Sequence, residues 1–217
     1  MLLISVLALV ALAKGVQAQD AMTFRLGSTG QCAGPCPEVI TAEGEIADRT
    51  PGDFVNFVRG NSPGGNPNAV IFINSPGGKV VAAMELGKIF RRMGVSAVVG
   101  RPEPRLDGGP IRFSGASCFS ACVYALMGAK TRVIPRQSRV GLHRMFAYES
   151  GADSGDVAGD RRRRFDDGRV AGVLERYSAM MGVSPGLVHA AEHGSFDGLR
   201  ILTPSEIAKW RLGSPKL

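Results

Sequence analysis

Beyond residue 18, the sequence lacks any run of the roughly 18 consecutive apolar residues that a membrane-spanning helix requires. Aromatic residues are also scarce, at 6% of the chain. The densest basic cluster, residues 160–167, carries its own acidic residues and lacks the alternation of basic and aromatic side chains that nucleic-acid-binding surfaces use. We therefore expect no nucleic-acid partner and interpret this cluster as the solvated start of a helix.

The one long apolar stretch lies at the N-terminus, where residues 2–13 are followed by Val16-Gln17-Ala18, a small-x-small cleavage signal. This pattern predicts a signal peptide over residues 1–18 and a mature protein that is periplasmic or secreted. Because no charged residue precedes the apolar run and Lys14 follows it, an uncleaved membrane anchor stays open as an alternative. We expect contact with a membrane only if this segment is not cleaved. Loss of Lys14 on cleavage would lower the formal net charge from +7 to +6.

Cysteine is rare, with four residues: Cys32, Cys36, Cys118 and Cys122. An even number of cysteines in an exported chain favours disulfides; three pairings are open, and the two C-x-x-x-C spacings suggest local bridges. Two cysteines four residues apart on a helix, as we expect for Cys118 and Cys122, would aim their Cβ atoms poorly at each other. Zinc is disfavoured because neither pair has the usual companion histidine or cysteine, so we predict no metal.

The remaining composition, 44% apolar in 217 residues, predicts one substantial core rather than a disordered or fibrous protein. We divide the chain into a cysteine-containing N-terminal segment, residues 19–37, and one domain, residues 38–217. Apolar runs predict strands and helices that alternate along this domain, which indicates an α/β fold. The predicted strands are residues 38–46, 69–74, 95–100, 131–135 and 138–143. The predicted helices are residues 50–60, 75–94, 169–182, one that carries both Cys118 and Cys122, and two that begin near residues 184 and 203. A Pro/Gly-rich loop is predicted over residues 101–115.

Three stretches in this order resemble the Clp protease proteolytic subunit and its relatives of the crotonase-like fold. They are "IFINSPGGKVVAAMELG", "SACVYALMGAKTRVIPRQSRVGLH" and, more loosely, "FDGLRILTPSEIAKW". The Cys-x-Ser-Ala-Cys arrangement behind a signal peptide resembles exported, Clp-like predicted periplasmic proteins. The resemblance implies a single domain built as a spiral of β-β-α units, and a hydrolase that acts on peptides or proteins. A homo-oligomer is compatible with it.

Gly77 and Gly78 lie at a predicted strand-to-helix turn, where backbone N–H groups are unpaired and no side chain blocks a ligand. A tight connection that needs glycine for geometry alone is the simpler interpretation of this turn. Ser120 lies near a helix start, so that the N–H groups of Ala121 and Gly78 could hold the negative oxygen of a tetrahedral intermediate. The resemblance implies that Ser120 is the nucleophile. Ser117 is its competitor, because "GASCF" begins like the G-x-S-x-G elbow but ends in Phe119.

His143 ends a predicted strand 23 positions after Ser120. The resemblance implies that it is the general base and that an acid lies just before the last helix. Asp197 is near that place, although not at the spacing of the family, and a turn aspartate before Gly198 is an equal interpretation. Such a hydrolase requires no metal and no organic cofactor.

Other functions stay open. A catalytically inactive Clp-like module that binds peptide or assembles would keep the fold, and the position of Asp197 favours it. A serine–lysine peptidase would use Lys130 or Lys79 as its base. Acyl-CoA chemistry could use the same glycine turn but gives little reason for export.

Overall fold

The computed structural model describes residues 20–28, 38–61, 69–103, 112–148, 163–165, 169–194 and 198–216. The sequence predictions that lie outside these residues include the signal peptide, the cysteines at positions 32 and 36, and Asp197. Within the described residues, no helix is both long enough and apolar enough to cross a bilayer.

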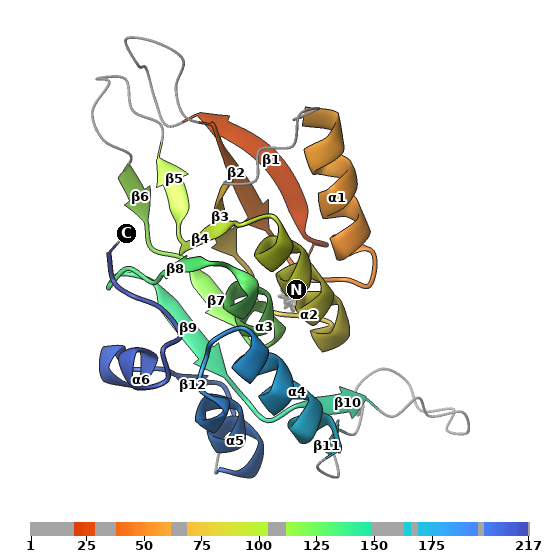
Figure 1. Ribbon diagram of the computed structural model, residues 1–217, viewed down its shortest axis with the longest axis vertical. Coiled ribbons are helices and arrows are strands. Elements are labelled where there is room, and N and C mark those ends of the chain that lie inside the picture. The colour runs from red at the N-terminus through yellow and green to blue at the C-terminus, as the bar shows by residue number, and fades with distance from the viewer. Residues whose placement is uncertain are drawn as a thin grey trace, which may run out of the picture.

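The larger sheet has five strands in the order β1-β2-β3-β4-β8 (Figure 1). Strand β1 pairs antiparallel with β2, and the other neighbours are parallel. The parallel strands are short and apolar, which is typical of strands covered on both faces. Ile71 and Ile73, for example, are fully buried in β3. The bounds are β1 Thr23–Ser28, β2 Glu38–Glu43, β3 Val70–Asn74, β4 Ser96–Val99 and β8 Thr131–Val133.

A second, three-stranded sheet has the order β12-β9-β7, with β7 and β9 parallel. Its strands are β7 Ser117–Phe119, β9 Arg139–Leu142 and β12 Arg200–Ile201. Two backbone hydrogen bonds join β7 to Ser75, the residue after β3. Ser75 N–H donates to the Ser117 carbonyl at 2.8 Å, and Phe119 N–H donates to the Ser75 carbonyl at 3.1 Å. The C-terminal ends of β3, β7 and β9 therefore meet at one edge. Two short antiparallel pairs complete the strands of the described residues: β5 Arg101–Glu103 with β6 Arg112–Ser114, and β10 Phe146–Tyr148 with β11 Arg163–Phe165.

Helix α3, Ala121–Gly128, is buried along its whole length. It packs against α2, Val80–Arg92, at Gly87 and Gly128, where a Cβ on Gly128 would lie 2.3 Å from the Gly87 Cα. Two helices can approach this closely only without side chains at the contact. The Tyr177 hydroxyl closes the same junction by donating to the Tyr124 carbonyl at 2.8 Å.

The other helices are α1 Thr50–Asn61, α4 Arg169–Met180, α5 Pro185–His193 and α6 Pro204–Lys209. Side-chain caps begin the last two. The Ser184 hydroxyl accepts from Gly186 N–H, and Thr203 forms a reciprocal capping box with Glu206. Helices α4 and α5 lie side by side near β10 (Figure 1).

The α/β prediction is confirmed, with three local corrections. Cys118 lies in strand β7 rather than on the helix with Cys122, because its backbone pairs with Ser75 and β9. Residues 101–103 and 112–114 form strands at the two ends of the predicted loop. Residues 163–165 form strand β11, not the start of a helix, because they pair with β10.

Candidate active site

Ser120 lies between β7 and α3 with φ 53° and ψ −123°. This conformation is costly for any residue with a Cβ, and such costs concentrate at functional sites. Its side chain makes no capping hydrogen bond, whereas Ser184 and Thr203 cap their helices from ordinary extended backbone. A serine that served as a helix cap would have no need of this backbone. The residue is half-buried at the turn.

The glycine turn faces Ser120 directly. A Cβ on Gly77 would lie 2.8 Å from the Ser120 Cβ and 3.2 Å from the Ala121 nitrogen. Gly77 N–H donates to the Ser75 hydroxyl at 3.2 Å. In contrast, the N–H groups of Gly78 and Ala121 donate to no acceptor in the described part of the chain. The two uncommitted donors are therefore the chain neighbour of Ser120 and the chain neighbour of Gly77, the residue that faces Ser120.

Backbone contacts with Ile46 hold the turn in place. Ile46 N–H donates to the Gly77 carbonyl at 2.7 Å, and Lys79 N–H donates to the Ile46 carbonyl at 2.8 Å. Gly78 fits only because it has no side chain, since a Cβ there would lie 2.2 Å from the Ile46 carbonyl oxygen. The direction of the Gly78 N–H is consequently fixed by backbone atoms.

His143 follows β9, the parallel neighbour of β7. Phe119 and Gly141 are paired in register, and Ser120 N–H donates to the Gly141 carbonyl at 2.9 Å. His143 is thus two residues beyond the carbonyl that anchors Ser120, at the same edge of the sheet. Among the described contacts, no hydrogen bond joins the Ser120 hydroxyl to the His143 ring.

The His143 ring is oriented by its own loop. Nδ1 lies 2.7 Å from the Arg144 carbonyl oxygen, and the ring stacks on Phe146 with centroids 5.1 Å apart. Since a carbonyl oxygen can only accept, this contact requires a proton on Nδ1. In the neutral ring Nε2 then carries the lone pair, as a general base requires.

Glu192 is a residue that the sequence interpretation missed. It is 4% exposed, and both carboxylate oxygens lie 3.2 Å from the Met145 nitrogen, which donates to them. The carboxylate on α5 therefore holds the loop that carries His143. The sequence does contain a pattern that marks this residue: Glu192 continues the apolar helix face of Leu187, Val188 and Ala191, where an acidic side chain is rare unless it is hydrogen-bonded or paired.

A disulfide joins Cys118 and Cys122, the pair that the helix argument disfavoured. It becomes feasible because Cys118 lies in a strand, and its Cα is 5.2 Å from that of Cys122. Both cysteines are fully buried, and the bridge spans the turn at Ser120. It therefore restricts the backbone on both sides of the candidate nucleophile.

The two lysines proposed as alternative bases differ in position. Lys130 follows the C-terminal end of α3, about 12 Å along the helix axis from Ser120 at 1.5 Å per residue. Lys79 is exposed and adjacent to Gly78 in the chain. Only Lys79 remains near the candidate site.

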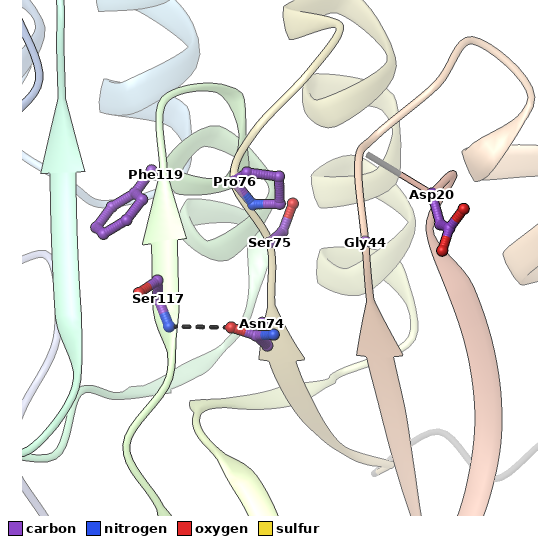
Figure 2. Close-up of a pocket in the computed structure, with 7 residues that line it drawn as sticks. All are labelled: Asp20, Gly44, Asn74, Ser75, Pro76, Ser117 and Phe119. Atoms are coloured by element: carbon purple, nitrogen blue, oxygen red, sulfur yellow. Dashed lines mark hydrogen bonds between the residues drawn. The ribbon is translucent and has the colours of Figure 1, made fainter. Parts of the chain in front are cut away.

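A cavity of about 300 Å³ opens beside the glycine turn (Figure 2). Pro76, which precedes the two glycines, and Phe119, which precedes Ser120, both line it, and the Phe119 ring points away from Pro76 (Figure 2). Ser117 N–H donates to the Asn74 side-chain oxygen at 3.1 Å, which joins strand β7 to strand β3 at the cavity. The lining residues are Asp20, Gly44, Asn74, Ser75, Pro76, Ser117 and Phe119. Ser120 itself does not line the cavity, but Phe119, its neighbour in the chain, does.

No family model and no curated protein matches the chain. Among solved structures, a serine-to-alanine mutant of the 1510-N membrane-bound stomatin-specific protease superposes with a TM-score of 0.55 at 16% identity, covering 80% of this chain and 76% of that one. A lysine-to-alanine mutant of the same protease, in complex with a substrate peptide, gives 0.54 at 16% identity, with 80% and 72% covered. The chain has a Clp protease-like fold. A mutant ClpP1 from Listeria monocytogenes superposes less well, with a TM-score of 0.47 at 17% identity over 78% of this chain and 84% of that one. The superpositions on the stomatin-specific protease confirm the predicted fold, and identities this low establish the fold alone.

Proposed function

We propose that the chain is an exported serine hydrolase that acts on peptides, with Ser120 as nucleophile and His143 as general base. The observation that carries the proposal is the costly backbone of Ser120, held against Gly77, with an uncommitted N–H group on the chain neighbour of each. Export rests on the signal-like pattern of residues 1–18.

In the proposed reaction, His143 Nε2 takes the Ser120 hydroxyl proton as Oγ attacks the substrate carbonyl. The Gly78 and Ala121 N–H groups donate to the oxygen that becomes negative. The protonated His143 then passes its proton to the leaving amine, and a water molecule repeats the sequence to release the acid. The Arg144 carbonyl replaces the acid of the predicted triad by holding Nδ1–H. Asp197 is therefore not required for this step.

The peptide substrate class is supported by the neighbours, whose printed names describe a protease and a bound substrate peptide. The cavity lined by Pro76 and Phe119, the chain neighbours of Gly77 and Ser120, offers a place for part of a substrate. The same names describe a serine mutant and a lysine mutant, which keeps Lys79 as a competing base.

A second candidate function is the catalytically inactive peptide-binding or assembly module. It is favoured by one observation: the described contacts include neither a Ser120–His143 hydrogen bond nor a carboxylate on the His143 ring. Hydrogen bonds at catalytic groups often tighten only when substrate binds, so this geometry is also compatible with an enzyme.

Labelling with a fluorophosphonate probe tests the proposal. The probe should modify Ser120 in the folded chain, and Ser120→Ala should remove the labelling. His143→Ala should slow the reaction strongly, whereas Lys79→Ala should have little effect. If Lys79→Ala abolishes labelling and His143→Ala does not, the base is Lys79. Folded protein that never reacts would favour the binding module.

A further inference from the structure

Three side chains with metal-binding atoms meet on the surface of the α4–α5 pair, apart from the Ser120 site. They are Glu175 from α4 and His189 and His193 from α5. One ligand atom from each lies within 4.8 Å of the others. The two imidazole rings have centroids 4.7 Å apart, and His189 Nδ1 lies 3.3 Å from a Glu175 carboxylate oxygen. We infer that these residues bind a divalent transition metal, with Zn²⁺ as the best fit.

The distances suit a zinc ion. Bonds of about 2.0–2.1 Å in tetrahedral geometry separate neighbouring ligand atoms by about 3.3 Å. The Glu175–His189 contact already has that length, and the His193 ligand atom lies within 4.8 Å of both, so a rotation of its ring can bring it to bonding distance. Its side chain is exposed and free of tight packing, so this rotation displaces no core atom.

The local backbone favours a cation at this point. His189 and His193 are four residues apart, so they project from the same face of α5. His193 is the last residue of the helix, where the C-terminal carbonyl groups carry partial negative charge. Glu175 supplies a carboxylate, and the three protein ligands leave a fourth position for water. Two imidazoles select zinc and similar metals over Mg²⁺ and Ca²⁺, which prefer oxygen ligands.

The spacing His189-x-x-Glu192-His193 is that of zinc peptidases with an inverted motif, in which the glutamate activates the metal-bound water. Here Glu192 is buried and accepts from Met145 N–H, whereas both histidines are exposed. The glutamate is thus committed to the loop of His143. The site is consequently a metal-binding clamp between α4 and α5 rather than a second catalytic centre.

The experiment measures Zn²⁺ binding to the full chain by competition with a chromophoric chelator, without reductant so that disulfide cysteines supply no ligand. One equivalent should bind, and Mg²⁺ should not compete. His189→Ala, His193→Ala and Glu175→Gln should each weaken binding at least about tenfold, because disturbing even an outer partner of a zinc ligand costs about that much. His143→Ala is the matched control: it removes an imidazole elsewhere and should leave the affinity unchanged.

Thermal unfolding gives an independent test of Zn²⁺ binding. Zn²⁺ at about a hundredfold excess over its Kd should raise the Tm of the wild-type chain by about 5–10 °C, since it binds only the folded arrangement. The double variant His189→Ala/His193→Ala should show no such rise. All three side chains are at least partly exposed, so their truncation leaves no cavity, and circular dichroism should confirm folding. Absence of binding at millimolar Zn²⁺, or an affinity in all three variants equal to that of the wild-type chain, would overturn the inference.

Discussion

Replacing Gly77 with alanine tests the contact between the glycine turn and Ser120. The added Cβ would lie 2.8 Å from both the Phe119 carbonyl oxygen and the Ser120 Cβ, and 3.2 Å from the Ala121 nitrogen. Gly77 also has φ 116°, which residues with a side chain rarely adopt. The backbone strain costs about 1–3 kcal/mol, and the overpacking costs about 1–3 kcal/mol more. We therefore expect the free energy of unfolding to fall by about 2–6 kcal/mol.

Thermal unfolding and hydrolysis of a peptide ester measure the two consequences. For a domain of this size the Tm should fall by about 5–20 °C, at about 2–4 °C per kcal/mol. The turn can relieve the contact only by moving away from Ser120, and a displacement of about 1 Å in an active site can cost about 10²-fold in rate. The value of kcat/KM should therefore drop by up to about 10²-fold in the fraction that remains folded.

Gly52→Ala is the matched control. Gly52 lies in α1, and a Cβ there would meet no atom within 4 Å. Alanine should be neutral or stabilise the chain by about 0.5–1 kcal/mol, and activity should not change. If Gly77→Ala behaves like Gly52→Ala in both assays, the close packing of the turn against Ser120 is wrong.

Three further predictions concern the surroundings of the site. Replacing Cys118 and Cys122 with alanine should lower the free energy of unfolding by about 2 kcal/mol, the loop-closure value for a bridge of sequence separation 4; unchanged denaturant midpoints would contradict this. Glu192→Ala should lower kcat more than it alters KM, because the His143 loop loses its hydrogen bond to α5. Glu192→Gln should recover activity, since its amide oxygen can still accept from Met145 N–H. Equal losses in both variants would refute the positioning role. Donation from Thr203 N–H lowers the pKa of Glu206 below its ordinary value near 4.5, so the carboxylate stabilises the fold above that pH and loses its contribution as the pH falls through the lowered pKa. Wild-type protein should therefore lose more stability on acidification than Glu206→Gln does, and parallel acid-unfolding curves would contradict the assignment.

The features that local sequence patterns encode were predicted well. The apolar runs correctly predict the buried strands β3 and β4, and Thr203-Pro204 correctly predicts the start of α6 and its cap. The two glycines are correctly placed at the turn between β3 and α2. These predictions succeed because strand burial, caps and glycine turns depend on neighbours in the chain.

Features that depend on distant contacts were not predictable in the same way. Strand β7 has only three residues and exists because it pairs with Ser75 and β9, so Cys118 was assigned to the wrong element. The conformation of Ser120 is likewise imposed by its surroundings. The carbonyl that orients His143 belongs to its own loop, and no side-chain pattern reports a backbone acceptor.

Hydrolysis by Ser120→Ala and Ser117→Ala, compared in equally folded preparations, tests the central claim most directly. Both variants lose one hydroxyl from the same strand-to-helix segment, so neither leaves a large cavity. Ser120→Ala should abolish peptide and ester hydrolysis, whereas Ser117→Ala should retain it. Activity that survives Ser120→Ala and disappears with Ser117→Ala would move the nucleophile three residues upstream, and activity that survives both would make Ser120 a structural residue.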